Sequence, residues 1–586
     1  MKHADVIAKL SLREKCALLS GATVFETHAL PNKGVPAIWL SDGPNGLRKQ
    51  AGPADHLGLN PSEPATCFPT AATVANSWDP ALGEEIGKAL GEETASYSVN
   101  VILGPGLNTK RSPLCGRDFE YFSEDPYLSG KLAAGYVRGI QSVGVSACPK
   151  HFAANNQELR RMASNSVLDE RTLRELYLTG FEIAVKEGRP KCIMTSYNRV
   201  NGTYANENHH LLQDILHDEW GYDGAVVTDW GGSNDHVEGV REGSTLEMPC
   251  PGFGSAKRLM QAVEEGRLPE SAVDARVDEL LELVFTTDAA VKAAPKRFDR
   301  DAHHALARRA AAESVVLLKN EDDLLPLKPG QRVALIGDFA QTPRYQGAGS
   351  SSVNATRVDN LKDAAEADDI TLAGFCAGYE RSGTPNPAFV EEAAALARKA
   401  DVVVLCMGLD ESNESEGLDR SHICIPENQK QLLEAVAQAN ENLVVVLSAG
   451  SVVETGWASR CKAVLHAYLG GQAGAGAIMD VLTGRVNPSG KLAETLPLTY
   501  EDTPAARYFP GKQQNVEYRE GLYIGYRYYE TAHVPVRYPF GYGLSYTTFA
   551  YSDLKADADK VTFTITNTGS RAGAEIAQLY VAKADA

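Results

Sequence analysis

The chain has 586 residues, too many for one ordinary domain, and this length predicts about three or four domains. Its 76 Asp and Glu residues outnumber its 57 Lys and Arg residues, and the net charge of −19 excludes a nucleic-acid backbone as the main ligand. Apolar residues make up 43% and charged residues 23%, which excludes a disordered chain.

The ten cysteines show no CxxC spacing, which indicates reduced thiols rather than a disulfide framework. The N-terminus lacks the apolar core of a secretory signal. The longest apolar stretch, residues 402–409, is far shorter than a membrane span. The sequence therefore predicts a cytoplasmic protein that meets no membrane, unless a signal was removed.

Short strand-like runs alternate with amphipathic helices through residues 1–290. Strands are predicted at residues 37–40, 101–103, 146–148, 192–195 and 225–228. Helices are predicted at residues 82–96, 129–142, 170–186, 207–219 and 270–284. This alternation predicts parallel strands, and its length suits a TIM-like (β/α)8 barrel.

An Ala- and charge-rich linker that runs into a helix is expected at residues 291–312. A second alternating block spans residues 313–495 and predicts an α/β sandwich. Its strands are expected at residues 315–318, 333–336, 402–406, 443–447 and 463–467, and its helices at residues 387–400 and 429–439.

Residues 496–545 are rich in Pro, Gly and Tyr and predict an extended connection lying over the domains. Residues 561–566 alternate strictly, and a second strand through residue 581 is expected to pair with them as an antiparallel hairpin. A β-sandwich needs about seven strands in roughly 100 residues. Residues 546–586 are therefore expected to be a truncated domain.

Asp229 and Trp230 end the apolar run at residues 224–228. The carboxyl end of a strand is the active face of a parallel barrel. A carboxylate there, beside a Trp that can stack on a sugar, suits a glycosidase nucleophile. The alternative is an Asp that caps the helix beginning near residue 233.

Other polar side chains follow strand ends on the same predicted face. They include Lys150 and His151, the turn at residues 41–48 and the segment at residues 116–120. Each segment alone is weak evidence for a binding site, but together they supply ionic donors and acceptors for a substrate with many hydroxyl groups. The set is Asp42, Arg117, Lys150, Arg161, Tyr197 and Asp229.

A glycosidase needs a second carboxyl group. Four candidates lie in the loop that follows the strand at residues 402–406, namely Glu411, Glu414, Glu416 and Asp419, and the residues alone do not choose among them. No metal site and no cofactor are predicted, because His210, Asp214 and His217 on one helix face lack a metal-binding pattern. The glycine-rich stretch at residues 470–476 predicts a tight turn from a strand into a helix.

Taken in chain order, the segments LGPGLNTKRSPLCGRDFEYFSEDP, KHFAANNQELRRM, VVTDW, ESEGLDR, SGKLAETLP and YPFGYGLSYTTF resemble a β-glucosidase of glycoside hydrolase family 3. The resemblance covers nearly the whole chain. It implies a TIM-like barrel, an α/β sandwich and a C-terminal fibronectin type III-like β-sandwich, which would be partial here.

The resemblance also assigns site residues. Asp229 would be the nucleophile and Glu416 the general acid/base. The sugar would be bound by Asp42, Arg48, Arg117, Lys150, His151, Arg161, Met194, Tyr197 and Trp230, with Ser350 at the edge. KHFAANN replaces the KHFPGHG-type motif of the N-acetylglucosaminidase branch, which argues against that activity.

The expected function is a retaining, exo-acting β-glucosidase that releases terminal nonreducing β-D-glucosyl residues by double displacement. A β-xylosidase or broad-specificity β-glycosidase is the near alternative, and a non-catalytic carbohydrate-binding protein is the alternative from another class. The expected substrates are β-glucosides and cello-oligosaccharides. No binding to nucleic acid or to a membrane is expected, and a homodimer is one option for the oligomeric state.

Overall fold

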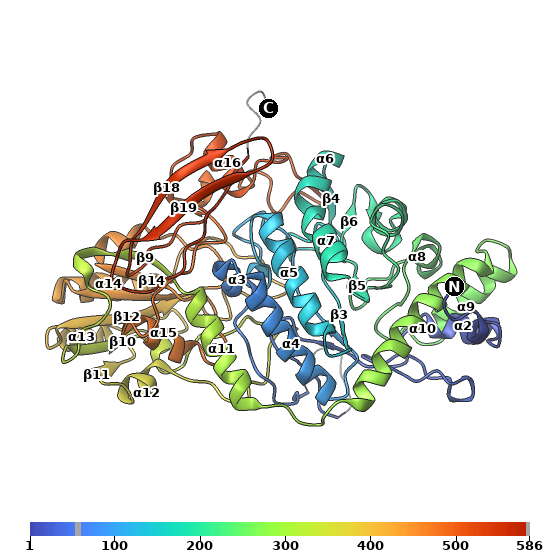
Figure 1. Ribbon diagram of the computed structural model, residues 1–586, viewed down its shortest axis with the longest axis horizontal. Coiled ribbons are helices and arrows are strands. Elements are labelled where there is room, and N and C mark those ends of the chain that lie inside the picture. The colour runs from blue at the N-terminus through green and yellow to red at the C-terminus, as the bar shows by residue number, and fades with distance from the viewer. Residues whose placement is uncertain (53–59, 582–586) are drawn as a thin grey trace.

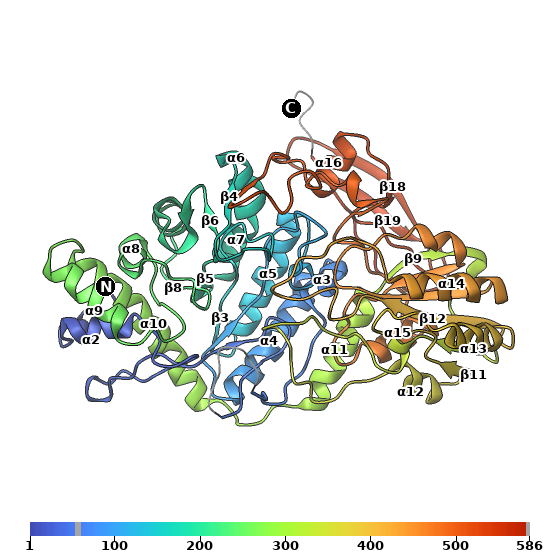
Figure 2. The ribbon, with the colours of Figure 1, turned by 180° about the vertical axis from the view of Figure 1, so that it is seen from behind.

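The computed structural model describes residues 1–52 and 60–581 as two large α/β units with an antiparallel hairpin beside them (Figure 1). The first unit, drawn in blue and green, is barrel-like. The second, in yellow and orange, contains a six-stranded sheet. Figure 2 shows from behind how the chain after the second unit returns to the first.

Short parallel strands form the centre of the first unit. One sheet holds β1 (Leu40–Asp42), β2 (Val101–Leu103) and β3 (Ser146–Ala147), and another holds β5 (Cys192–Met194) and β8 (Ala225–Val227). Single backbone bridges from Phe152 to Thr195 and from Val227 to Leu246 join and continue these sheets. Each of the five predicted strands overlaps one of them, the first only at Leu40.

Helices α4 (Pro80–Ser96) and α5 (Pro126–Gln141) cover this unit and begin in the same way. An Asp caps each helix, and a Pro occupies the first turn, where its missing N–H costs nothing. The helices pack so closely that a Cβ at Gly139 would lie 2.1 Å from the Glu84 carbonyl oxygen. The first unit also contains α2 (Leu12–Leu18), α7 (Thr179–Ile183), the π-helix His210–Glu219, α8 (His236–Glu242), α9 (Gly254–Glu264) and α10 (Glu270–Ala293).

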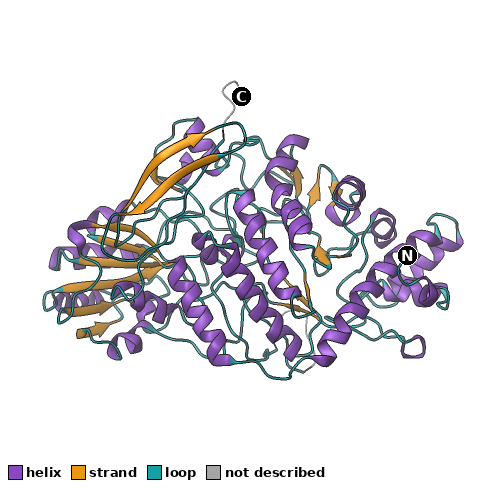
Figure 3. Cartoon of the chain, viewed as in Figure 1, coloured by secondary structure: helices purple, strands orange, loops and turns teal. Residues whose placement is uncertain are grey.

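The sheet of the second unit has the strand order β11-β10-β12-β13-β14-β9, with only β9 antiparallel to its neighbour. Its strands are β9 (Val316–Asn320), β10 (Arg332–Ile336), β11 (Thr371–Cys376), β12 (Val402–Gly408), β13 (Leu443–Ser448) and β14 (Ala463–His466). Along β12, alternate side chains enter two separate apolar clusters, so both faces of the sheet are buried. Figure 3 shows the helices that cover it. The sequence prediction missed β11, an edge strand with mostly half-buried residues.

The chain passes between the units at residues 294–299, between the end of α10 and the start of α11 (Arg300–Ser314). Most of the range predicted as a linker, residues 291–312, therefore lies in α11, and the unit limits at residues 290, 313 and 495 stay predictions. The helices of the second unit are α12 (Leu361–Glu366), α13 (Pro387–Ala397), α14 (Glu427–Ala439) and α15 (Gly474–Leu482).

After the second unit, the connection contains short elements. They are β15 (Leu496–Pro497), β16 (Asn515–Glu517), α16 (Gly525–Thr531) and β17 (Val536–Tyr538). β16 pairs in parallel with β4 (Asn165–Val167) of the first unit. The connection therefore contacts the first unit through β16, and it contains a helix, α16, that was not expected.

The predicted pairing at the C-terminal end is wrong. β19 (Val561–Asn567) pairs with the preceding strand β18 (Phe549–Ala556), and no described residue after Asn567 belongs to a strand. The following segment binds the second unit instead: Arg571 donates to the Gly484 carbonyl at 3.0 Å. Alternation identified the strand, but it carries no information about its partner. Residues 582–586 of the predicted last domain lie outside the described residues.

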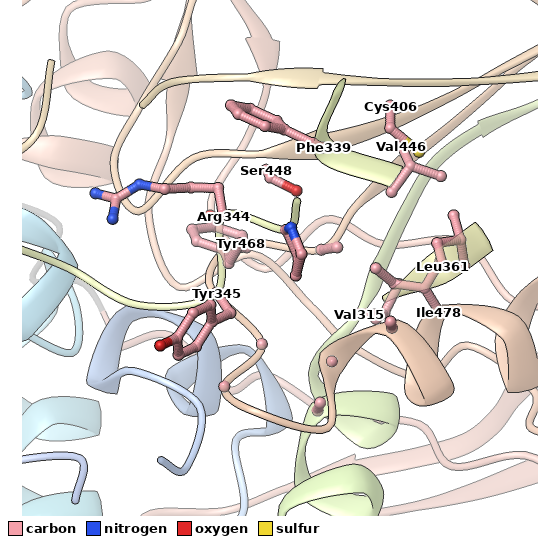
Figure 4. A pocket seen from close by; sticks show the side chains of 17 residues that line it. Val315, Phe339, Arg344, Tyr345, Leu361, Cys406, Val446, Ser448, Tyr468 and Ile478 are labelled. Atoms are coloured by element: carbon pink, nitrogen blue, oxygen red, sulfur yellow. The ribbon is translucent and has the colours of Figure 1, made fainter. Parts of the chain in front are cut away.

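A small cavity lies at the carboxyl ends of β12, β13 and β14, lined by Cys406, Val446, Tyr468 and Ile478 among others (Figure 4). Its volume is about 30 Å³, which is the space of about one water molecule and is too small for a sugar ring. The glycine-rich stretch at residues 470–476 borders it and turns from β14 into α15, which confirms the predicted turn.

Candidate active site

The polar residues predicted at strand ends gather on one edge of the first unit. Asp42 is the last residue of β1, Lys150 and His151 follow β3, Tyr197 follows β5, and Asp229 follows β8. They lie together because the carboxyl ends of parallel strands share one edge.

Asp229 is only 8% exposed. Its Oδ1 accepts a hydrogen bond from the Trp230 backbone N–H at 2.8 Å, while its Oδ2 has no hydrogen-bond partner in the part of the chain that the structure describes. His151 Nε2 lies 3.7 Å from that oxygen. Burial raises the pKa of Asp229, and the positive charges of Arg117 and Arg161 reduce the shift without cancelling it. Asp229 thus presents an oxygen that is free to react.

Glu416 reaches the same place from the second unit, in the loop after β12. Its Oε1 accepts from Arg161 at 2.8 Å and lies 3.5 Å from Arg117, and its Oε2 accepts from the Ser350 backbone N–H at 2.7 Å. The Ser350 hydroxyl donates to Oε2 as well. Burial opposes ionisation, but these donors outweigh it and hold the pKa of Glu416 well below its usual range. Glu416 is therefore ionised while these donors contact it.

The other three carboxylates of this loop have different surroundings. Glu411 is about half exposed and lies 3.6 Å from Arg344. Glu414 is buried, and its carboxylate accepts from the Ser451 hydroxyl and the Gly450 N–H. Asp419 accepts only backbone N–H groups. Of the four, Glu416 is the one whose charge raises the pKa of Asp229, so its environment singles it out.

Two predicted sugar-binding cations share the carboxylate of Glu120, which lies in the candidate segment at residues 116–120 but was given no role there. Glu120 accepts from Arg117 Nε at 2.7 Å and lies 3.0 Å from Lys150 Nζ, and all three residues are at most 3% exposed. Burial opposes its ionisation, but the two cations lower the pKa of Glu120. The spacing of Arg117 and Glu120, three residues apart, was the only signal in the sequence.

His151 is fixed by groups of the first unit. Its ring Nδ1 lies 3.1 Å from the Tyr121 hydroxyl, and its backbone N–H donates to Asn108 Oδ1 at 2.7 Å. Burial, together with the charges of Arg117 and Lys150, pushes the pKa of His151 well below its usual range. The ring is neutral and serves as a hydrogen-bonding group rather than a charge.

The remaining predicted residues surround this centre. Arg48 donates to the Gly349 carbonyl at 3.0 Å and so reaches the loop that holds Ser350. Trp230 is partly buried, and its Nε1–H donates to the Val24 carbonyl at 2.8 Å. Met194 is 2% exposed and packs in the apolar cluster that Trp230 adjoins.

Residues 1–52 and 60–581 contain no group of three or more His, Cys, Asp and Glu side chains that could hold a metal ion. Across the same ranges, no helix has the length and apolar character needed to cross a membrane. The arrangement supplies two carboxylates from different units within a shell of buried Arg, Lys and His side chains. Two facing carboxylates are what glycosidic bond cleavage requires.

Comparisons with known proteins agree with this chemistry. A model described as Glycosyl hydrolase family 3 N terminal domain matches residues 58–283, and one described as Glycosyl hydrolase family 3 C-terminal domain matches residues 315–546. The structure is similar to that of beta-glucosidase 3B from Thermotoga neapolitana in complex with alpha-D-glucose. The TM-score is 0.91 at 35% identity, covering 98% of this chain and 87% of the other.

Two curated relatives carry different activities in their names. Thermostable beta-glucosidase B of Acetivibrio thermocellus is 50% identical over 589 residues, which cover 98% of this chain and 78% of that protein. Exo-alpha-(1->6)-L-arabinopyranosidase of Bifidobacterium longum is 45% identical over 592 residues, which cover the same shares. On these matches, the chain belongs to glycoside hydrolase family 3.

Proposed function

We propose that this glycoside hydrolase is a retaining, exo-acting β-glucosidase that releases terminal nonreducing β-D-glucosyl residues. The observation that carries the proposal is the contrast between two buried carboxylates. Among the described residues, Asp229 Oδ2 has no hydrogen-bond partner, whereas both oxygens of Glu416 accept hydrogen bonds from groups that a sugar can take over. The names of its relatives support glucose as the sugar.

In the first step, Asp229 Oδ2 attacks the anomeric carbon while protonated Glu416 gives its proton to the glycosidic oxygen. The bond from the carbon to the leaving oxygen breaks, and a glycosyl ester on Asp229 forms. In the second step, Glu416 takes a proton from water, and the water oxygen displaces Asp229 from the same carbon. Two inversions give net retention.

Glu416 must carry a proton in the first step, although Arg117 and Arg161 hold its pKa well below its usual range. Sugar hydroxyls that accept hydrogen bonds from these two guanidinium groups withdraw them from the carboxylate. The pKa of Glu416 then rises, because fewer donors stabilise its charged form. Binding of the substrate thus prepares the acid that cleaves it.

We assign the sugar contacts to the residues around this centre. Asp42 accepts hydrogen bonds from hydroxyls, and Lys150 donates to others. The neutral His151 ring can donate or accept, and Trp230 stacks on the apolar face of the sugar ring. Glu120 keeps Arg117 and Lys150 in place without touching the sugar. Tyr197, whose hydroxyl donates to the Trp230 carbonyl at 2.8 Å, orients the stacking residue.

Glucose is expected to bind more weakly as pH falls through about 6. Burial raises the pKa of Asp42 to about 6, so below that pH its carboxyl is protonated and loses its charge-assisted hydrogen bonds. A charged acceptor contributes about 1 kcal/mol more than a neutral one, so the inhibition constant of glucose should rise roughly fivefold. The measurement is that constant between about pH 5 and about pH 7.5. Asp42→Asn should bind glucose weakly at every pH. If its inhibition constant for glucose kept the wild-type pH dependence, this role of Asp42 would be wrong.

An arabinopyranosidase is the second candidate, because two relatives at 45% identity bear that name. A panel of p-nitrophenyl glycosides separates the candidates: β-D-glucoside, β-D-xyloside, α-L-arabinopyranoside, β-D-galactoside, N-acetyl-β-D-glucosaminide and α-D-glucoside. We expect the highest kcat/KM on the β-D-glucoside. If the enzyme prefers the arabinopyranoside, its substrate sugar is arabinopyranose and not glucose. If it prefers the α-D-glucoside, the proposed specificity for β-glucosides is wrong. Sugar binding without turnover of any member would favour a carbohydrate-binding protein.

Several finer features are part of the same proposal. The barrel-like unit is taken as a (β/α)8 barrel, and the β18–β19 hairpin as part of a fibronectin type III-like domain. A cytoplasmic location and a homodimer also stay predictions from the sequence.

A further inference from the structure

Asp419 lies three residues after Glu416 in the second unit, yet its carboxylate bonds only to the first unit. Oδ1 accepts from the backbone N–H groups of Gly116 at 3.1 Å and Glu158 at 2.9 Å, and Oδ2 accepts from that of Leu159 at 2.8 Å. Three converging N–H groups form a built acceptor site for one carboxylate.

Glu158 of the first unit in turn accepts a hydrogen bond from the second unit, and it is 3% exposed. Its Oε2 accepts from the Gly417 N–H at 2.8 Å and from Arg161 at 2.8 Å. The same Arg161 nitrogen donates to Glu416 Oε1. Bonds to the first unit therefore hold the segment that directly follows Glu416, through the Gly417 N–H and through the Asp419 carboxylate.

No space separates the two units at this point. A Cβ at Gly116 would lie 1.8 Å from the Leu418 carbonyl oxygen and 2.6 Å from that of Ser415. The loop that carries Glu416 thus rests on the Gly116 backbone, and any side chain there would lift it.

We propose that Asp419 is a positioning residue that fixes the height and orientation of Glu416 over Asp229. The inference rests on the proposed role of Glu416 as acid/base. Each unit supplies one of the two reacting carboxylates, so their separation depends on how the loop sits on the first unit. A misplacement of about 1 Å can cost about 10²-fold in rate.

The test uses the leaving group, because a general acid matters most when the departing oxygen is a strong base. In Asp419→Asn, one amide NH2 group faces an N–H donor and repels it. We expect kcat/KM to fall about 10²-fold for phenyl β-glucoside but less than about threefold for 2,4-dinitrophenyl β-glucoside, whose departure needs little protonation. The inhibition constant of glucose should change less than about twofold, because the sugar contacts remain.

Asp410→Asn is the matched control, because Asp410 lies in the same loop and bonds only to Ser412 and Asn413. It should retain wild-type values on both substrates. Gly116→Ala lifts the loop from the side of the first unit and leaves the Asp419 carboxylate itself unchanged, and it should reproduce the dependence on the leaving group. It also decides the matter if Asp419→Asn does not fold.

Glu416→Ala is measured in parallel. Suppose that Glu416→Ala lowers kcat/KM for the phenyl glucoside but not for the dinitrophenyl glucoside. If Asp419→Asn and Gly116→Ala do not show this difference, the positioning role of Asp419 is wrong and the acid/base role of Glu416 stands. If Glu416→Ala itself shows no such dependence, the acid/base assignment fails. Equal losses on both substrates, with weaker glucose binding in the Asp419 and Gly116 variants, would show a merely structural contact and overturn the proposal.

Discussion

Replacing Asp229 with Ala is expected to lower kcat/KM for aryl β-glucosides by roughly 10⁴-fold or more, because no other group can form the glycosyl ester. The fold should survive. Arg117, Lys150 and Arg161 keep Glu120, Glu158 and Glu416 as partners, so no buried cation is left unpaired. The measurement is steady-state kinetics on p-nitrophenyl β-D-glucoside, with a melting curve as the check on folding.

Asp223→Ala is the matched control for this change. Asp223 is an aspartate of the same unit with a side chain 81% exposed, bonded to Lys2, and its removal should leave the kinetics unchanged. The anomer that the wild-type enzyme first releases tests the chemistry independently. Freshly formed β-glucose, read by proton NMR before mutarotation, indicates double displacement, and α-glucose would exclude a covalent role for Asp229.

Replacing Glu416 with Ala is expected to cost about 10²- to 10⁴-fold on substrates with poor leaving groups. On an activated aryl glucoside the glycosyl ester should still form, but water then attacks slowly because no base assists it. Azide needs no base. It should restore turnover by displacing Asp229 from the anomeric carbon, and the product should be β-glucosyl azide.

The control for Glu416 comes from the same loop. Glu411→Ala removes a carboxylate that is about half exposed and pairs only loosely with Arg344 and Arg381, so it should behave like the wild type. Full activity of Glu416→Ala on a phenyl glucoside, or rescue that yields no glucosyl azide, would assign the acid/base role to another group.

Sequence reasoning was strongest where geometry follows from chain order. Asp42, Lys150 and Asp229 lie on one edge because the strands before them are parallel, and strand ends can be identified from local patterns. Bottom-up reasoning could not choose Glu416 among four carboxylates. The choice depends on Arg161, which lies 255 residues away along the chain, and on Ser350, and no local pattern encodes those contacts.

The role of Glu120 within the candidate segment at residues 116–120 and the partner of β19 could not be predicted for the same reason. The role of Glu120 depends on Lys150, which approaches from another strand end. The pairing of β19 depends on the following segment binding the second unit at Gly484 and not returning to the sheet. Local alternation specifies which residues form a strand, but packing selects the neighbour.

The pairing of β16 with β4 makes the second unit a closed loop of chain. It leaves the first unit through residues 294–299 and returns to it at β16, so both ends are anchored on the unit that carries Asp229. A tether closed at two points allows far fewer separated arrangements than one free linker does. Glu416 therefore stands near Asp229 at a high effective concentration even before the contacts between them form.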